Sequence, residues 1–365
     1  MIRNPHRRVS RAAAVTALVL PFALAACGSL DDEGTPAENS PGAEQEDPGG
    51  ADNETGDGSP GGDGPTIVTV PKLTGVSWFN RMEEGVVRYA ESTDADAYMQ
   101  GSGQADANAQ VRVLEDMLAA GVDALAVVPF QPDAVEQVLG QAMADDVVVI
   151  THEAPGIENA DWDLEAFRND DYGRNLMDEL AAGMGEEGQY ALMVGSLSSA
   201  THMDWATAAK EYQEQTYPDM EHVGDIIETS DDSQIAYERM QEVLTAYPEI
   251  KGVQGSASTD VVGAGQAVDE AGLSDVVTVV GTSVPNDARA GLEIGSIDAI
   301  TFWDPADAGE AMNALAQLVL DGEEVTTGDD LGVPGYESIT VDGKVVYGDE
   351  AWITVTAENV DEYDF

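Results

Sequence analysis

The chain has 365 residues, with 70 acidic against 15 basic side chains and a formal net charge of −55 at pH 7. So acidic a surface argues against nucleic acid and against anionic phospholipid as partners. Cys27 is the only cysteine, which excludes an intramolecular disulfide framework and a thiolate metal site.

The N-terminal residues are typical of an export signal. Four arginines precede an apolar run from Ala12 to Ala26, which at about 15 residues is too short to cross a bilayer comfortably. The run closes on Leu-Ala-Ala-Cys27 and resembles a bacterial lipoprotein signal peptide over residues 1–26. The resemblance implies cleavage before Cys27, lipidation of its sulfur, and a place on the extracellular face of the cell membrane, or in the periplasm where an outer membrane exists. An ordinary secretion signal with a chance cysteine is the alternative.

The segment that follows the signal has the composition of a linker. Residues 28–65 are almost entirely small, polar or acidic, and Leu30 is their one large apolar side chain. Such a segment cannot bury enough surface to offset the entropy of ordering it. We therefore expect residues 27–65 to form a lipidated cysteine followed by a disordered acidic linker.

From Thr66 onward, short apolar runs alternate with longer helical patterns. Strands are expected at residues 66–70, 94–99, 124–128 and 147–151, with helices at about 80–91, 108–120 and 132–144. Apolar residues in the second of these helices recur every three or four positions, as on one face of a helix. The alternation predicts a parallel sheet with helices on both faces.

The pattern then begins again. Strands are expected at residues 190–194, 222–228, 252–254, 276–281 and 299–302, and helices at about 172–184, 203–215, 233–246, 260–271 and 286–292. Two open α/β units in succession predict two lobes. Ligands of open α/β sheets bind outside the carboxyl ends of the strands, so the residues just after each strand are the candidates.

In the first unit, Lys72 follows the first strand and precedes the aromatic pair Trp78 and Phe79. Aromatic faces pack on the C–H faces of sugars, and a lysine donates hydrogen bonds to their oxygens. His152 and Glu153 end the fourth strand, where a carboxylate can accept two hydroxyl hydrogens. The alternatives are aromatic residues that cap the core and an acid that faces solvent.

In the second unit, polar or aromatic clusters again stand at the strand ends. The candidates there are Thr201, His202, Ser256, Ser258, Ser283, Trp303 and Asp304. Each signal is weak alone, because residues such as Ser258 are also common helix N-caps. Their recurrence at nearly every strand end is what makes them candidates for ligand binding.

Residues 101–129 combine a polar run, an amphipathic helix, Gly-Val-Asp and an apolar strand that ends in proline. With Val279–Pro285 and Ile300–Asp304, this stretch resembles the ribose-binding type of sugar-binding proteins of bacterial ABC importers. Within that family the nearest likeness is to autoinducer-2-binding and rhamnose-binding proteins. The resemblance covers about residues 66–316 and implies an α/β fold of two lobes, the type I periplasmic-binding-protein fold.

The same resemblance implies roles for several residues. Lys72 matches the ligand-contacting lysine of the autoinducer-2 binders. Trp78 and Phe79 match the family's aromatic pair, which stacks on the ligand. Other candidates depart from the family pattern and put the identity of the ligand in question. Glu153 stands where the subgroup has an aspartate, Thr201 and His202 stand where it has an Asp-Gln pair, and Ser256 and Ser258 replace a proline and an alanine. Ser283 stands where ribose binders have an aspartate, and Trp303 stands where they have a glutamine. A pentose, deoxyhexose, polyol or autoinducer-2-like ligand remains compatible.

The family also implies the domain layout and the partners. We expect an N-terminal lobe of residues 66–154 plus about 303–322 and a C-terminal lobe of residues 155–302 plus about 323–365. Three crossings would join them, near Ala154, near residues 301–305 and in residues 322–334. The expected partners are a small sugar, an ABC permease and its ATPase; we expect a monomer, no cofactor and no nucleic acid.

Two other functions fit parts of the sequence. A sensor domain that feeds a membrane receptor would share the fold and its closure. A metal-dependent hydrolase would use His152, Glu153 and His202, but no metal-ligand spacing of known type and no Gly-x-Ser-x-Gly motif occurs. We therefore expect a binding protein and not an enzyme.

Overall fold

The computed structural model describes residues 64–348 and 352–365. The expected signal peptide, Cys27 and nearly all of the expected linker lie outside these residues. Within them, no helix has both the length and the apolar character that a membrane crossing needs. The described chain forms two seven-stranded sheets.

The first sheet contains the first five strands and two late ones. They are β1 (Thr66–Val70), β2 (Asp96–Met99), β3 (Ala124–Val127), β4 (Val148–His152), β5 (Trp162–Glu165), β12 (Thr340–Asp342) and β13 (Val345–Tyr347), in the order β12-β13-β5-β4-β3-β1-β2. All neighbours are parallel except β12 and β13, which form an antiparallel hairpin. Every residue of β3 and β4 is buried, as expected for central parallel strands covered on both faces.

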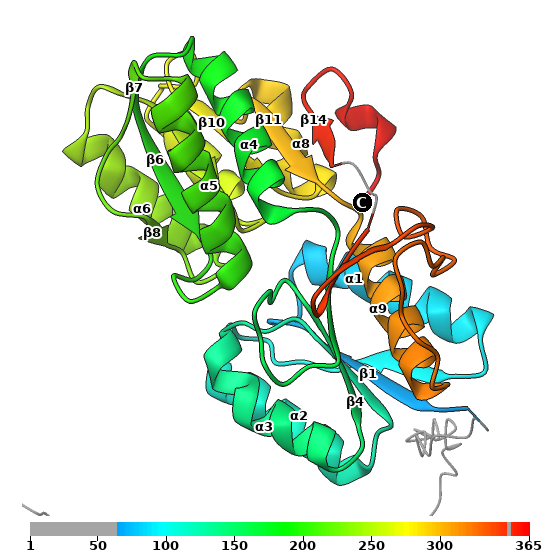
Figure 1. The fold of residues 1–365 in the computed structure, drawn as a ribbon. Helices are drawn as coiled ribbons and strands as arrows, with labels where there is room; N and C mark the ends of the chain where they lie inside the picture. Colours follow the sequence, from blue (N-terminus) through cyan, green and yellow to red (C-terminus); the bar gives the residue numbers. More distant parts are fainter. Residues whose placement is uncertain (1–63, 349–351) are drawn as a thin grey trace, which may run out of the picture. The chain divides into compact units, whose positions relative to one another are not determined.

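Four helices cover this sheet, and together with it they form the first lobe (Figure 1). They are α1 (Ser77–Ser92), α2 (Ala107–Ala120), α3 (Pro132–Ala144) and α9 (Pro305–Leu320). Alternate strand residues pack in different clusters: Ile67 with α1 and α9, and Val68 with α2 and α3. Because successive strand residues point to opposite faces, α1 and α9 cover one face and α2 and α3 the other.

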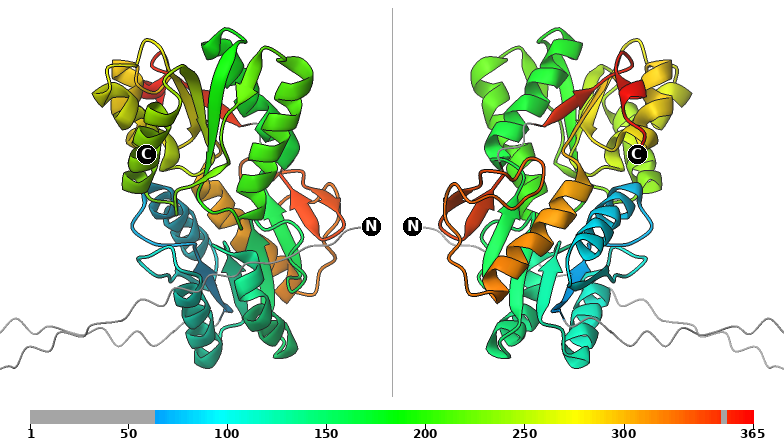
Figure 2. Two further views of the ribbon diagram at one scale, coloured as in Figure 1. Left: turned by 90° about the vertical axis from the view of Figure 1, so that its left-hand side faces the viewer. Right: turned by 90° about the vertical axis from the view of Figure 1, so that its right-hand side faces the viewer.

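Helices α1 and α9 pack side by side, as the blue and orange helices of Figure 2 show. A β-carbon added at Gly85 of α1 would stand 1.8 Å from the carbonyl oxygen of Ala306 in α9. Gly309 of α9 also lies close to the backbone of α1, where a β-carbon would meet the Met82 carbonyl oxygen at 2.6 Å. The contact therefore requires glycine on both helices.

The second sheet, with helices on its faces, forms the second lobe. Its strands are β6 (Gly188–Val194), β7 (Met220–His222), β8 (Ile227–Glu228), β9 (Ile250–Gly255), β10 (Thr278–Thr282), β11 (Ala299–Phe302) and β14 (Ile353–Val355), in the order β14-β11-β10-β9-β6-β7, with β8 also paired to β6. Its helices are α4 (Asn169–Met184), α5 (Ala200–Thr216), α6 (Ser233–Ala246), α7 (Asp260–Glu270) and α8 (Pro285–Ile294), followed near the chain end by the 3₁₀ turn η1 (Val360–Glu362). Strand β14 lies antiparallel to β11, next to it in Figure 1, and the other neighbours are parallel.

The two-lobed α/β architecture expected from the sequence is confirmed, but two segments belong to the other lobe. Strand β5 and the β12–β13 hairpin pair within the first sheet, whereas residues 155–302 and 323–365 were assigned to the second lobe. The chain therefore changes sheets between β5 and α4, between β11 and α9, and between Tyr347 and Ile353. The sequence places the first crossing too early, near Ala154, because β5 is short and half polar and is not predicted as a strand. It also places the third crossing too early, in residues 322–334, because the β12–β13 hairpin is not predicted.

Candidate functional site

A narrow cavity lies where the carboxyl ends of strands from both sheets meet. The residues that line it are Lys72, Trp78, Phe79, Glu153, His202, Asp231, Ser256, Ala257, Ser258, Thr282 and Trp303. The space between their atoms amounts to about 280 Å³, including the opening to solvent, and little of it is wide enough for more than a water molecule. Eight of the twelve ligand-binding candidates from the sequence are among these residues.

The centre of the cavity is a buried ion pair. Lys72 Nζ lies 2.5 Å from Glu153 Oε2, and both side chains are almost completely buried. Burial alone would raise the pKa of Glu153, but the ammonium of Lys72 holds it at about 2. Burial alone would lower the pKa of Lys72, but the carboxylates of Glu153 and Asp231 raise it above its ordinary value. Both groups are therefore charged at neutral pH.

The backbone at Glu153 is bent to place this carboxylate. Glu153 has φ +57°, the left-handed conformation that is unusual for a residue other than glycine. Asp163 of β5 holds the residues on either side, since its Oδ1 accepts hydrogen bonds from the Thr151 hydroxyl at 2.7 Å and the Ala154 amide at 3.2 Å. Backbone strain of this kind is often found at functional sites, where the surrounding structure maintains it.

A buried glutamine supports the loop that carries Lys72. The Gln110 amide donates to the carbonyl oxygens of Pro71 at 3.0 Å and Val128 at 2.8 Å, and its oxygen accepts from the Phe130 amide at 3.0 Å. Gln110 thereby ties together the loops that follow β1 and β3. Its role was not foreseen, although a buried polar residue in an otherwise amphipathic helix is a usable signal.

His202 reaches the ion pair from the second lobe. Its Nδ1 accepts a hydrogen bond from the Gly195 amide at 3.2 Å, and its Nε2 lies 3.3 Å from Lys72 Nζ. Burial and the adjacent ammonium of Lys72 lower the pKa of His202 to about 3, so the ring is neutral. Because Nδ1 accepts, the single ring proton is on Nε2, which makes His202 a hydrogen-bond donor toward the cavity.

Three aromatic side chains form the apolar walls. Trp78 and Trp303 meet edge to face, with ring centroids 4.7 Å apart, and Phe79 lies beside them. Phe167 packs against Trp303 at 5.1 Å, also edge to face, from the first crossing between the lobes. The buried Nε1 of Trp303 has no hydrogen-bond partner among the described residues, so a donor remains unused at this wall.

A loop after β9 forms the floor on the second-lobe side. The Asp260 carboxylate accepts hydrogen bonds from the amides of Ser256 and Ala257 and from the Thr229 hydroxyl. Asp260, the first residue of α7, thus fixes the loop that precedes this helix. The buried Ser256 hydroxyl has no partner in the described part of the chain. Ser256 is therefore free to bond a ligand.

Four predicted residues do not line the cavity, because other groups engage them or turn them away. Asp304 receives two hydrogen bonds from the Arg81 guanidinium, at 2.9 and 2.6 Å, and caps α9. The ring of His152 lies 2.6 Å, through Nδ1, from the Leu164 carbonyl oxygen. Ser283 donates to the Ser258 carbonyl oxygen, and Thr201 lies 3.4 Å from a carboxylate oxygen of Glu165.

Three lining residues were missed: Asp231, Ala257 and Thr282. Asp231 follows β8 in a run of polar residues, Thr-Ser-Asp-Asp-Ser. The sequence predicts only a strand at 222–228 and a helix from about residue 233, and Asp232 does cap α6. Polar residues after a strand were a usable signal here too.

Two buried acids lie behind Glu153, at the first crossing between the lobes. Burial raises the pKa of Asp163 to about 7. Burial, together with the charges of Asp163 and Glu153, raises the pKa of Glu165 well above its ordinary value. Because the two carboxyls share one strand and face the same way, they hold at least one proton between them at neutral pH.

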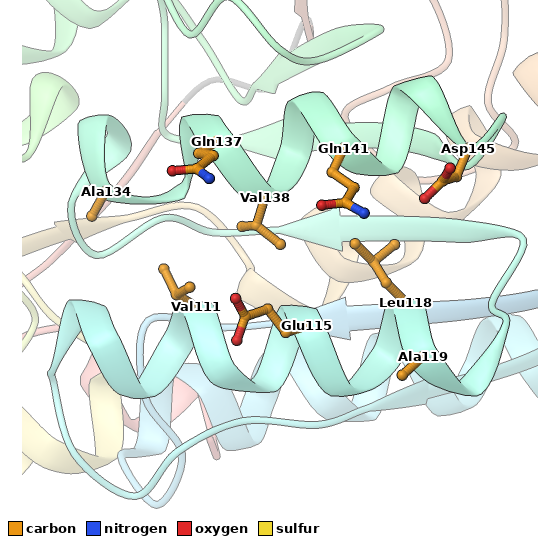
Figure 3. A pocket seen from close by; sticks show the side chains of 9 residues that line it. All are labelled: Val111, Glu115, Leu118, Ala119, Ala134, Gln137, Val138, Gln141 and Asp145. Atoms are coloured by element: carbon orange, nitrogen blue, oxygen red, sulfur yellow. The ribbon is translucent and has the colours of Figure 1, made fainter.

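A wider groove lies elsewhere, between α2 and α3 (Figure 3). Its side chains come from the outer parts of the two helices, including Val111, Glu115, Val138 and Gln141, and it contains about 850 Å³ of space that is largely open to solvent. It lies away from the strand ends that form the cavity. Within residues 64–348 and 352–365, no three His, Cys, Asp or Glu side chains are arranged to hold a metal ion.

Comparison with known proteins assigns the chain to a family. Residues 67–324 match the periplasmic binding protein domain, and the chain belongs to that family. It is 33% identical over 135 residues to the D-apiose import binding protein of Actinobacillus succinogenes, which is 37% of this chain and 42% of that protein. It is 31% identical over 111 residues to the D-xylose-binding periplasmic protein of Haemophilus influenzae. These residues make up 30% of this chain and 32% of that protein. The match thus spans less than half the length of either relative.

Solved structures share the fold over most of the described chain. LsrB from Clostridium saccharobutylicum in complex with AI-2 has a TM-score of 0.76 and 22% identity, over 82% of this chain and 100% of that one. A solute-binding protein of an ABC transporter from Clostridium phytofermentas, with bound L-rhamnose, has a TM-score of 0.76 and 18% identity. The match covers 82% of this chain and 98% of that chain. The expected resemblance to these proteins is confirmed.

Proposed function

We propose that this protein is the extracellular substrate-binding lipoprotein of an ABC importer, and that it captures a small sugar or sugar-like molecule in the cavity between its lobes. The ligand would be a pentose, deoxyhexose, polyol or autoinducer-2-like compound. The proposal makes the protein a binding protein and not an enzyme. Its relatives with known ligands are named for binding or import of D-apiose and D-xylose.

The observation that carries the proposal is the meeting of Lys72 and Glu153 with His202 between apolar walls. Lys72 and Glu153 come from the first lobe and His202 from the second. A charged donor, a charged acceptor and a neutral donor in a mostly aromatic cavity suit a neutral polyhydroxy compound, which both donates and accepts hydrogen bonds. The unused groups of Trp303 and Ser256 add a donor and a hydroxyl.

The size of the cavity supports a cycle of opening and closing. Since little of the present space exceeds the width of a water molecule, a sugar enters only when the lobes separate. Lys72 Nζ and His202 Nε2 approach within 3.3 Å across the cavity, and both are donors, so a ligand oxygen placed between them would accept from both lobes and hold them together. The ligand then favours the closed form because it contacts both lobes only there. A permease would recognise that closed form.

A ligand panel tests the proposal. The purified protein is heated in moderate salt with pentoses, deoxyhexoses, tetritols and autoinducer-2 precursors. A ligand at 100 times its dissociation constant stabilises the native state by about 2.7 kcal/mol. That gain raises the melting temperature by several degrees. A cooperative unfolding transition that no compound shifts would contradict the proposal and direct attention to amino acids and nucleosides.

The anchor has its own test. Growth of the producing cells with a labelled fatty acid is expected to label the protein, and Cys27→Ser is expected to abolish the label and release the protein from the membrane fraction. The matched control Ser29→Ala, two residues away, is expected to remain labelled and membrane-bound. Labelling of the Cys27→Ser variant would contradict the lipoprotein assignment.

A further inference from the structure

Asp231 is a cavity residue whose carboxylate has no hydrogen-bond partner among the described residues. It lines the same space as Lys72 and Glu153, and the electrostatic field of its carboxylate acts on the Lys72 ammonium. Within the described residues, no donor is within hydrogen-bond reach of its side chain, whereas the next residue, Asp232, accepts two amide hydrogens of α6. The two neighbouring acids therefore have different surroundings, and only Asp231 faces the cavity.

The backbone around Asp231 is built to place it there. Ser230 and Asp231 have φ +59° and +52°, so two successive residues other than glycine adopt the left-handed conformation. The turn is tied to β6, because the Ser230 amide donates to the Gly195 carbonyl oxygen at 2.7 Å. A β-carbon at Gly195 would stand 2.5 Å from Asp231 Oδ1, so only glycine leaves room for this carboxylate. Such costly local geometry is expected where the side chain has a function.

Asp231 changes the charge of the cavity. The positive charge of Lys72 is already matched by Glu153 at 2.5 Å. Burial raises the pKa of Asp231, and the ammonium of Lys72 opposes that rise. Because His202 is neutral, an ionised Asp231 gives the lining one more negative charge than positive charge. An anionic ligand in this space would meet a like charge in partly desolvated surroundings, which weakens its binding.

We propose that Asp231 determines the specificity of the site: it accepts a hydroxyl hydrogen from an uncharged sugar or polyol, and it excludes sugar acids and sugar phosphates. The inference rests on the function proposed above and narrows its ligand class. Glu153 from the first lobe and Asp231 from the second would then hold different hydroxyls of one ligand, so that the neutral compound contacts both lobes.

A matched pair of ligands and a matched pair of variants test this. Xylitol and D-xylonate are both linear and differ in one terminal group, a neutral alcohol against a carboxylate; L-rhamnitol and L-rhamnonate form a second such pair. Dissociation constants are measured by titration calorimetry for the wild-type protein, Asp231→Asn and Asp232→Asn. Asparagine adopts the left-handed conformation at least as readily as aspartate, so the substitution keeps the turn. Asparagine at position 232 keeps a good N-cap of α6 and makes the same charge change beside the cavity.

The wild type is expected to bind the neutral member at least tenfold more tightly than the acid. In Asp231→Asn the neutral ligand is expected to lose at least tenfold in affinity, because a hydrogen bond to a charged acceptor is replaced by a weaker one. The preference for neutral over acidic ligand is expected to fall by a further factor of about ten, since the like charge is gone. Asp232→Asn is expected to match the wild type in both respects.

The outcomes separate the two proposals. The role of Asp231 would be overturned if Asp231→Asn bound the neutral ligand within twofold of the wild-type affinity and kept the same preference over the acid. The binding function would then remain intact. An equal loss for both ligands, with a lower melting temperature, would show that Asp231 only supports Lys72. If neither these compounds nor the wider sugar panel bind the wild type, the proposed function fails, and the inference fails with it.

Discussion

Lys72 and Glu153, 81 residues apart in the chain, form one buried ion pair because the strands that precede them, β1 and β4, end at the same edge of one sheet. Taking two charges out of water is expensive, and a pair of this kind adds little stability over an apolar replacement. A gain in folding stability therefore does not explain its presence at the centre of the cavity, and the proposed ligand binding would.

The first prediction concerns this pair. Lys72→Met and Glu153→Gln are each expected to destabilise the protein by about 3–5 kcal/mol, because each leaves one buried group without its partner. The double variant is expected to lose clearly less than the sum of the two. Urea unfolding at pH 7 gives the free energies. The matched control is Lys251→Met, which removes a pair with Glu187 that is exposed to solvent and is expected to change stability little. Strictly additive single effects would contradict the coupling.

The second prediction concerns pH and the buried acid Asp163. Burial raises its pKa in the folded state to about 7, from an ordinary value of 3.8. Between these two values the folded state binds more protons than the unfolded state, so this carboxyl favours folding most below about pH 4 and loses that contribution as the pH rises toward 7. Asp163→Asn keeps an acceptor for Thr151 and removes the titration.

The measurement is the free energy of unfolding from pH 4 to pH 8 for both proteins. The wild type is expected to lose on the order of a few kcal/mol relative to Asp163→Asn over this range. Asp260, whose pKa is set by burial and by groups other than Asp163, titrates in both proteins and cancels in the difference. The coupled Glu165 does not cancel, so the difference reports on the pair of acids. A difference that does not change with pH would show that Asp163 is already ionised in the folded state.

The third prediction concerns a hydrogen bond between the lobes outside the cavity. The Ser77 hydroxyl of α1 donates to Asp287 Oδ1 of α8 at 2.7 Å. Because this bond exists only while the lobes are together, Ser77→Ala is expected to weaken ligand binding by about 2- to 10-fold, as for the loss of one hydrogen bond of about 0.5–1.5 kcal/mol. Titration with whichever sugar binds the wild type measures the change.

Ser92→Ala is the matched control for this bond, since Ser92 lies at the other end of α1 and donates only to the Tyr89 carbonyl oxygen. It is expected to leave affinity unchanged. Equal affinities for the Ser77→Ala and Ser92→Ala variants would mean that the bond between α1 and α8 does not favour the closed form.

The fourth prediction concerns the contact of α1 with α9. Alanine is a better helix former than glycine by about 1 kcal/mol, so Gly85→Ala would stabilise an isolated helix. In the folded protein the added methyl group meets the Ala306 carbonyl oxygen at 1.8 Å, and the two helices must separate. We expect a net loss of about 1–3 kcal/mol in the free energy of unfolding.

Gly103→Ala serves as the comparison, because no heavy atom would lie within 4 Å of its β-carbon. It is expected to change stability by much less. Both variants are measured by urea unfolding, and a Gly85→Ala protein as stable as the wild type would show that α9 can move away from α1 without cost.

Much of the fold follows from the alternation of apolar strands and amphipathic helices. Strands such as β3 are apolar throughout and buried throughout, and their pattern is unambiguous. Strand β5 has the sequence Trp-Asp-Leu-Glu, and its two acids indicate a segment exposed to solvent. The structure buries both acids. The β12–β13 hairpin was detectable, since its two-residue loop begins with Gly343 and lies between β-branched runs.

The site was predictable to the extent that strand ends meet at one edge. That rule brings Lys72, Glu153 and Ser256 together. It does not show which way each side chain points, so it cannot distinguish Glu153, which faces the cavity, from its neighbour His152. Nor does it show which acids already have a partner. Asp304 and Asp231 both stand after a strand, but Arg81 binds Asp304, whereas no described residue forms a hydrogen bond with the Asp231 side chain.

The return of the chain to both sheets has a consequence for its synthesis. Strands β12 and β13 complete the edge of the first sheet, and β14 that of the second, so both sheets receive their last strands from residues 340–355. Helix α9, which covers the first sheet, is made only after almost the whole second lobe. Neither lobe can therefore finish folding while the ribosome is still adding residues before about position 340. Each lobe of a chain of this design therefore remains incomplete for most of its translation.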